Sequence, residues 1–200
     1  PDHPMANHLL IHTVEAAHPL QGLEEAKRLE DLVPGAGHLV HMPAHIYIRL
    51  GLYHEATAAN LRAMGVDRRY LDQVDDSGVY RLAYVPHNYH FGWATATLEG
   101  RSELAIRLAQ EMSEQVDKEA MRRQPLTTLQ HYWITPLYAL VRFGHWNEVL
   151  AWPEPAKDLI YPRAVWHYAR GMAFTRTGAL DAAHTELTKL DALREDPSLK

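Results

Sequence analysis

Residues 49–60 read RLGLYHEATAAN, and a related pattern recurs three more times along the chain. The other copies are LEGRSELAIRLA (98–109), RFGHWNEVLAW (142–152) and RTGALDAAHTEL (176–187). Each copy has Gly, then a larger residue or Ser two positions later, then Ala or Val five positions later. Glycine ends a helix without the steric penalty of a Cβ atom, and a small residue one turn on lets a second helix pack closely. The pattern therefore predicts a helix hairpin at each copy.

The rest of the 200-residue chain fits a series of such hairpins. Apolar residues recur at three- and four-residue spacing, which is typical of helices, and no sustained alternation marks a strand. A weaker copy, with Gln21 in the glycine position, precedes the others. We expect an all-α protein: a single domain over residues 1–200 that forms an α-solenoid, a right-handed superhelical array. Its five hairpins are expected at 4–32, 38–70, 80–116, 126–152 and 162–193.

The repeated pattern resembles the tetratricopeptide repeat (TPR) family, and its best match is Gly51, Tyr53 and Ala56. Later copies replace the tyrosine, and the spacing between copies is uneven. The motifs HLLIH (8–12) and HLVHMPAHIY (38–47) also resemble an uncharacterised bacterial, histidine-rich branch of such proteins. The resemblance implies paired helices whose first members line a concave groove, and it implies no particular activity.

Composition excludes several classes of function. The 25 acidic and 20 basic residues give a formal net charge of −5 without any block of like charge, so nucleic acid is not an expected partner. The chain has no cysteine, which excludes disulfides and thiolate metal sites. Without a glycine-rich phosphate loop we expect no nucleotide cofactor. Apolar stretches are too short to cross a membrane, so we expect a soluble protein, cytoplasmic or periplasmic.

Both ends of the sequence suggest a fragment of a longer protein. The chain starts at Pro1 without a basic-then-apolar leader, and the last expected hairpin has no polar capping helix after it. An oligomer that forms through the ends of the array is a further expectation.

Histidine is unusually frequent, with 14 residues. When the hairpins are aligned on their junction position, histidine occupies the position thirteen residues earlier in four successive repeats, at His8, His38, His87 and His131. Further histidines follow on the same helices at His12, His41, His45 and His90. Residues three, four or seven positions apart share one face of a helix. The spacing therefore predicts a groove in which imidazoles converge with the carboxylate of Glu15.

This set of side chains favours a divalent transition metal (Zn, Cu, Ni or Fe), because neutral imidazole and carboxylate are usual ligands of these ions. The candidate ligands are His8, His12, Glu15, His38, His41, His45, His87, His90 and His131. In a catalytic centre Glu15 would be a ligand or a general base, but the sequence does not decide whether the protein is an enzyme. The alternative is that these histidines only bond carbonyls and aromatic edges within the array.

Two functions from different classes follow. In the first, the groove binds a transition metal or small ligand, with metal-dependent catalysis as an option. In the second, the protein is an adaptor or scaffold that binds a peptide or protein partner without metal. The candidate ligand contacts are Asn7, Arg49, Arg81, Tyr84 and Asn88. The two arginines can instead form salt bridges, for example with Glu15. The abundance of histidine and aromatic residues favours the first function.

Overall fold

The computed structural model describes residues 2–75 and 78–199. All regular secondary structure within these ranges is helical, as predicted. The chain divides into two compact units, Pro1–Leu108 and Ala109–Lys200. Of the domain expected over 1–200, Pro1, residues 76–77 and Lys200 lie outside the described residues, and its being a single domain stays a prediction.

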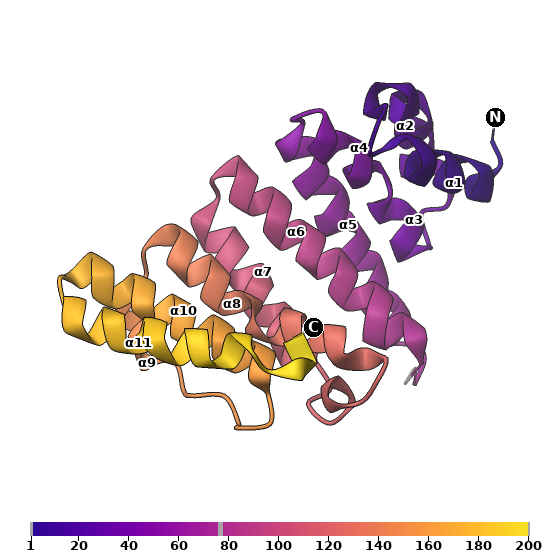
Figure 1. Ribbon diagram of the computed structural model, residues 1–200. Helices are drawn as coiled ribbons and strands as arrows, with labels where there is room; N and C mark the ends of the chain where they lie inside the picture. Colours follow the sequence, from indigo (N-terminus) through magenta and orange to yellow (C-terminus); the bar gives the residue numbers. More distant parts are fainter. Residues whose placement is uncertain (1, 76–77, 200) are drawn as a thin grey trace. The chain divides into compact units, whose positions relative to one another are not determined.

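The first unit contains the helices that later prove important for the candidate site. They are α1 (Pro4–Val14), η1 (Pro19–Gly22), α2 (Leu23–Leu32), α3 (Gly37–His41), α4 (Pro43–Arg49), α5 (Tyr53–Leu71), the π-helical turn η2 (Tyr80–Tyr84) and α6 (Val85–Glu99). Helix α1 packs on α2 and α4, α3 and α4 pack on α5, and α5 lies beside α6 (Figure 1). Helix α7 (Ser102–Gln115) begins in this unit and ends in the second.

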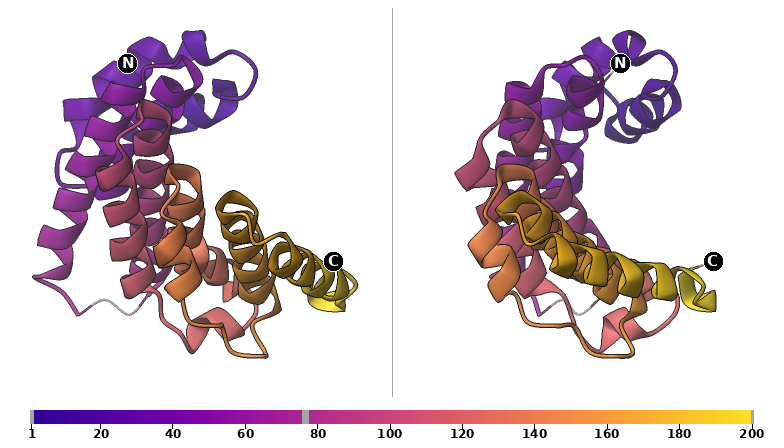
Figure 2. Two further views of the ribbon diagram at one scale, coloured as in Figure 1. Left: turned by 90° about the vertical axis from the view of Figure 1, so that its left-hand side faces the viewer. Right: turned by 60° about the vertical axis from the view of Figure 1, so that its left-hand side comes forward.

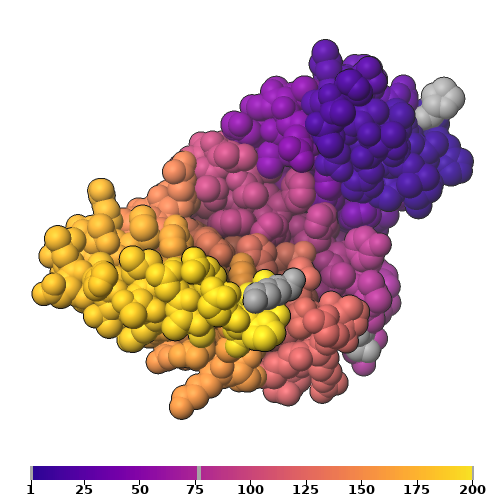
Figure 3. Space-filling view, viewed as in Figure 1, coloured from indigo at the N-terminus to yellow at the C-terminus, as the bar shows by residue number. Residues whose placement is uncertain are grey.

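The second unit is built around α10. Its elements are η3 (Ala120–Arg122), η4 (Leu126–Thr128), α8 (Leu129–Phe143), α9 (Trp146–Ala151), α10 (Ile160–Thr177), α11 (Leu180–Arg194) and η5 (Pro197–Leu199). Helix α10 packs against α8, α9 and α11, and it lies side by side with α11 (Figure 2). Helix α11, yellow in Figure 3, lies at the surface, and Glu186 is the residue that it buries.

The junctions between paired helices have the predicted left-handed glycines. Backbone φ values of 76°, 80°, 76° and 84° occur at Gly51, Gly100, Gly144 and Gly178. The N–H of the next residue then bonds to the carbonyl five residues back, as Arg101 does to Ala96 at 3.0 Å. This cap satisfies carbonyls that the end of a helix leaves free. The prediction of a helix end at each of these glycines is confirmed.

Three expected helices differ from the structure in detail. In the hairpin expected over 38–70, the first helix is broken between α3 and α4, because Pro43 has no N–H to continue the hydrogen-bond ladder. In the hairpin expected over 4–32, the first helix ends at Val14 and the 3-10 turn η1 precedes the second helix. The helix expected from Leu126 begins as the 3-10 turn η4 and becomes α-helical at Leu129.

Each unit has its own apolar core. In the first unit Ile11 of α1, Leu29 of α2 and Ile46 of α4 are fully buried in one cluster. In the second, Met121 and Leu129 pack in another. The first of these cores fixes the helices that carry the histidines. None of the helices in the described ranges is long and apolar enough to cross a membrane.

Gly37, at the start of α3, provides a direct test of this packing. A Cβ atom at this position would lie 1.8 Å from Oδ1 of the buried Asp67, whereas a Cβ at Gly35 would meet no atom within 4 Å. We expect Gly37→Ala to lower the free energy of unfolding by about 1–3 kcal/mol through overpacking. Gly35→Ala is the matched control and should change it by less than about 1 kcal/mol. Urea denaturation measures both, and equal effects would contradict the predicted contact.

Candidate metal centre

Helices of the first unit bring most of the predicted ligands together. Helix α1 and its C-terminal cap carry His8, His12 and Glu15; α3 and α4 carry His38, His41 and His45; and α6 carries His87. Three groups of these side chains have ligand atoms within 4.8 Å of one another: His8, His12 and His38; His38, His41 and His87; and His12, Glu15 and His45. We call these seven side chains the histidine cluster.

The imidazole rings of the cluster are in continuous contact. Ring centroids lie 4.8 Å apart for His8–His12, 4.9 Å for His12–His45, 4.8 Å for His45–His41, 5.7 Å for His41–His38 and 5.2 Å for His38–His8, which closes a circuit. The ring of His87 lies 4.7 Å from that of His41. The cluster grades from exposed to buried, since the His12 side chain is 39% exposed and His41 is 0% exposed.

The buried His41 is held in one tautomer. Its Nδ1 lies 2.7 Å from Oδ1 of Asn60. The Asn60 amide nitrogen donates to the Ala56 carbonyl at 2.8 Å, which identifies Oδ1 as the atom that faces the imidazole. A carbonyl oxygen only accepts, so Nδ1 of His41 carries the hydrogen. In the neutral ring, Nε2 of His41 is therefore left with a lone pair.

Glu15 fixes two further histidines in the same way. Its Oε2 lies 2.7 Å from Nδ1 of His45, and its Oε1 lies 2.9 Å from Nδ1 of His12. A carboxylate only accepts, so both Nδ1 atoms donate and both Nε2 atoms keep their lone pairs. Carboxylates that orient metal-binding histidines act in this manner.

The Nε2 atoms of three histidines lie close together in the interior of the protein. Nε2 of His41 lies 3.0 Å from Nε2 of His45 and 3.0 Å from Nε2 of His87. A hydrogen on Nε2 of His87 can satisfy the second contact, but the first brings two lone pairs together. A cation between them relieves this repulsion. Two nitrogens bound tetrahedrally to one Zn²⁺ at about 2.0–2.1 Å are roughly 3.3 Å apart, so the observed spacing is close to that of a metal site.

A further nitrogen of the cluster without a hydrogen-bond partner belongs to His38. Its Nε2 lies 3.3 Å from Nε2 of His8. Its Nδ1 is buried and has no hydrogen-bond partner within the described part of the chain. A buried polar atom without a partner is costly in the folded state, and a bound ion would provide one.

Burial lowers the pKa of the inner histidines in the folded protein. Burial, together with the nearby histidines, lowers the pKa of His38 to about 3 and that of His87 to about 4. The same causes lower the pKa of His41 well below its usual value. Burial alone would raise the pKa of Glu15, but hydrogen bonds from His12 and His45 outweigh it and hold that pKa below its usual value. Neutral imidazoles and an ionised carboxylate are the forms that bind metal.

Two of the predicted ligands belong to none of the three groups. The ring of His90 packs against Trp93, with centroids 5.1 Å apart, and His90 is in none of the three groups. His131 belongs to the second unit, where its Nδ1 lies 2.8 Å from the hydroxyl of Tyr161. That these two residues are metal ligands stays a prediction.

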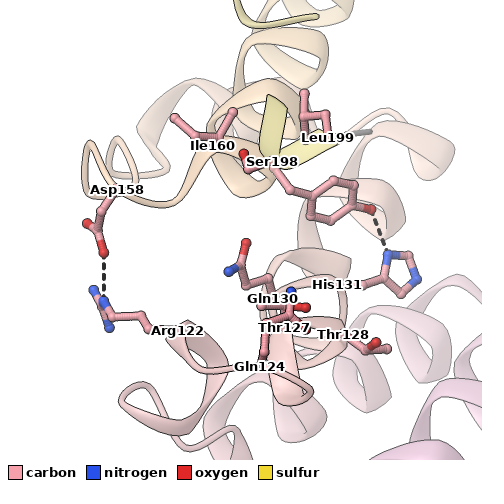
Figure 4. Close-up of a pocket in the computed structure, with 11 residues that line it drawn as sticks. Arg122, Gln124, Thr127, Thr128, Gln130, His131, Asp158, Ile160, Ser198 and Leu199 are labelled. Carbon is pink, nitrogen blue, oxygen red and sulfur yellow. Dashed lines mark hydrogen bonds and ion pairs between the residues drawn. The ribbon is translucent and has the colours of Figure 1, made fainter. Parts of the chain in front are cut away.

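His131 instead lines a cavity of about 560 Å³ within the second unit. Figure 4 shows it across this cavity from the ion pair of Arg122 and Asp158, in which Nε and Oδ2 are 2.8 Å apart. Burial lowers the pKa of His131. The equal sequence positions of His8, His38, His87 and His131 thus do not give them equal surroundings.

The two predicted asparagine contacts are engaged within the protein. Asn7 is buried, and its amide donates to the His3 carbonyl at 3.1 Å. Asn88 is fully buried and donates to the carboxylate of Asp67 at 2.7 Å. Both asparagines therefore make hydrogen bonds within the protein, and their role as ligand contacts stays a prediction.

The other predicted ligand contacts lie nearer the surface. The Tyr84 ring is 4.7 Å from that of His38, and 40% of this residue is exposed. Arg49 and Arg81 are exposed. The hydrogen-bond partners of Glu15 are histidines, and the expected salt bridge from either arginine to Glu15 is not among the ion pairs of the described residues.

Two residues that shape the site are not among the predicted ones. Asn60 of α5 orients His41, and Phe91 of α6 packs its ring 4.9 Å from that of His41 and 4.5 Å from that of His45. Phe91 follows His87 by one helical turn, so the spacing of α6 could have identified it. Asn60 lies on α5, the second helix of its hairpin. Its polar side chain at the end of the small-residue stretch ATAAN is the only sequence feature that could have identified it.

Comparisons with protein-family models, curated proteins and solved structures find no match. The resemblance to the TPR family therefore stays a prediction. A function for this protein is inferred from the geometry of the histidine cluster.

The metal-free protein should lose stability as the pH falls below about 6.5. His38 and His87, with folded pKa values of about 3 and 4, bind protons in the unfolded state before they do so in the folded state. The free energy of unfolding is therefore highest above pH 6.5 and falls toward pH 4, by up to about 1.4 kcal/mol per pH unit for each such histidine.

Urea denaturation between about pH 7.5 and 4.5, in the presence of a chelator, measures this slope. His87→Gln should make it shallower, whereas His18→Gln, on an exposed residue outside the cluster, should leave it unchanged. A free energy of unfolding that does not vary over this range would contradict the burial of neutral imidazoles.

Proposed function

We propose that this protein binds a divalent transition metal through the imidazoles of His38, His41, His45 and His87. Zn²⁺ is the first ion to test, because four neutral nitrogen ligands suit its tetrahedral geometry; Cu²⁺, Ni²⁺ and Fe²⁺ are the alternatives. The proposal is for binding, and catalysis is not part of it.

One observation carries this proposal. Nε2 of His41 and Nε2 of His45 lie 3.0 Å apart, while the Nδ1–H of each ring is already committed to Asn60 or Glu15. Side chains that served only to pack or cap helices would be expected to turn a donor toward an acceptor. Here two acceptors face one another, and the hydrogen bonds behind them hold both in that direction.

We also propose that the chain is a TPR-like array of helix hairpins, an α-solenoid whose first helices present the histidines. The repeated sequence pattern supports this, as do the left-handed caps at Gly51, Gly100, Gly144 and Gly178. Each cap separates two helices that the pattern predicts to pair.

Zn²⁺ should stabilise the untagged protein. At a free concentration of about 100 times Kd, it raises the free energy of unfolding by about 2.7 kcal/mol when it binds only the folded state. His41→Asn removes the central nitrogen and should abolish this gain, whereas His131→Asn, in the second unit, should retain it. Thermal denaturation with and without a chelator measures the shift, and elemental analysis gives the stoichiometry.

A purified protein that contains no metal and whose stability is unaffected by Zn²⁺, Cu²⁺, Ni²⁺ and Fe²⁺ would overturn the proposal. That result would leave a metal-free adaptor for a peptide or protein as the better explanation of the fold.

Glu15→Gln tests the supporting role of the carboxylate. Glutamine is similar in size, but an NH₂ donor replaces one of the two oxygens that accept from His12 and His45, so one of these N–H groups loses its acceptor. We expect Zn²⁺ affinity to fall about 10- to 100-fold, as for other residues that orient metal ligands. Competition against a chromophoric chelator measures it. Glu24→Gln on the exposed face of α2 is the control, and equal affinities of the two variants would refute the role of Glu15.

A further inference from the structure

The exposed side of the histidine cluster contains a second group of potential ligands. His8, His12 and His38 have ligand nitrogens within 4.8 Å of one another, and His12 is exposed. The inner group of His38, His41 and His87 is deeper, since His41 is completely buried. The two groups adjoin because both contain His38.

The nitrogens of the outer group are suitably placed for an ion. His12 donates its Nδ1–H to Glu15, which leaves the lone pair on its Nε2. His8 directs its Nε2 toward Nε2 of His38 at 3.3 Å. The other nitrogen of His8, Nδ1, lies 3.1 Å from the Met5 sulfur, a weak partner. Imidazole nitrogens of this group can therefore coordinate an ion at the surface of the protein.

His38 cannot serve both groups at once. A neutral imidazole has one lone pair, so His38 coordinates an ion in the outer group or in the inner group. Its Nε2 faces His8, and its Nδ1 is the buried nitrogen without a partner. This arrangement suits a ligand that passes an ion between two adjoining positions.

We infer that His8, His12 and His38 form an outer metal site through which a divalent transition metal reaches the buried site, with His38 transferring it from one to the other. This inference rests on the proposed function and adds a loading route to it. At equilibrium the ion occupies the inner site, and one ion is bound per chain. When His38 changes from Nε2 coordination in the outer site to Nδ1 coordination in the inner site, Nδ1 gives its hydrogen to water and Nε2 takes one from water. Each nitrogen that leaves the ion is replaced by another nitrogen or by water.

A loading route has a kinetic signature that a permanent ligand lacks. By microscopic reversibility, removal of a route slows binding and release by the same factor and leaves Kd unchanged. Removal of a permanent ligand weakens Kd and acts mainly on the dissociation rate. His8 and His12 are therefore expected to affect rates, whereas His41 and His87 affect affinity.

Stopped-flow mixing of the full metal-free chain with Co²⁺ tests this, with the visible absorbance of the tetrahedral ion as the signal. In the double variant His8→Asn/His12→Asn we expect association and dissociation rates to fall by about tenfold or more, with Kd within about threefold of the wild type. His18→Asn, on an exposed histidine that follows α1, is the matched control and should load at the wild-type rate. Far-ultraviolet circular dichroism confirms that the variants are folded.

Two results would overturn the inference while the proposed function stands. The first is a double variant that loads Co²⁺ at the wild-type rate, which would mean that the ion reaches the inner site by another path. The second is a double variant with tenfold weaker Kd and an unchanged association rate, which would make His8 and His12 permanent ligands. Absence of Co²⁺ and Zn²⁺ binding to the wild type at equilibrium would instead reject the proposed function itself.

Discussion

Two imidazole nitrogens that face each other in the protein interior impose the main constraint on this structure. His41 and His45 each use Nδ1 to donate a hydrogen bond, to Asn60 and to Glu15, and their Nε2 atoms then meet at 3.0 Å. Neither ring can turn over to relieve the contact without breaking the bond behind it. The repulsion is thus maintained by favourable interactions, and a cation is the simplest partner that satisfies both nitrogens.

The surrounding fold holds these rings in place. The apolar cluster of Ile11, Leu29 and Ile46 joins α1, α2 and α4. On the other side, Asp67 of α5 accepts hydrogen bonds from Tyr80 at 2.6 Å and from Asn88 at 2.7 Å. Gly37 packs against this carboxylate one residue before His38. The start of α3 is therefore fixed by a buried polar network, although α3 itself has only five residues.

Much of the architecture was predictable because it depends on local chemistry. Glycine at the helix junctions and the spacing of apolar residues predicted the helices. The i, i+4 pairs His8–His12 on α1 and His41–His45 across α3 and α4 predicted the grouping of these histidines. Pro43 breaks the helix between α3 and α4 because proline has no N–H to donate. The site was less predictable, because equal positions in degenerate repeats do not have equal neighbours. His131 and His90 hold the expected positions, yet they contact Tyr161 and Trp93. The role of Asn60 depends on the packing of α5 against α3 and α4, which periodicity does not give.

The cluster also draws on segments that are far apart in sequence. His38, His41 and His45 precede α5, and His87 follows it. An ion held by these residues would close a loop of the chain that contains the whole of α5, as a disulfide does in a secreted protein. The chain has no cysteine, so coordination would give it a reversible cross-link that chelators, rather than reducing agents, remove.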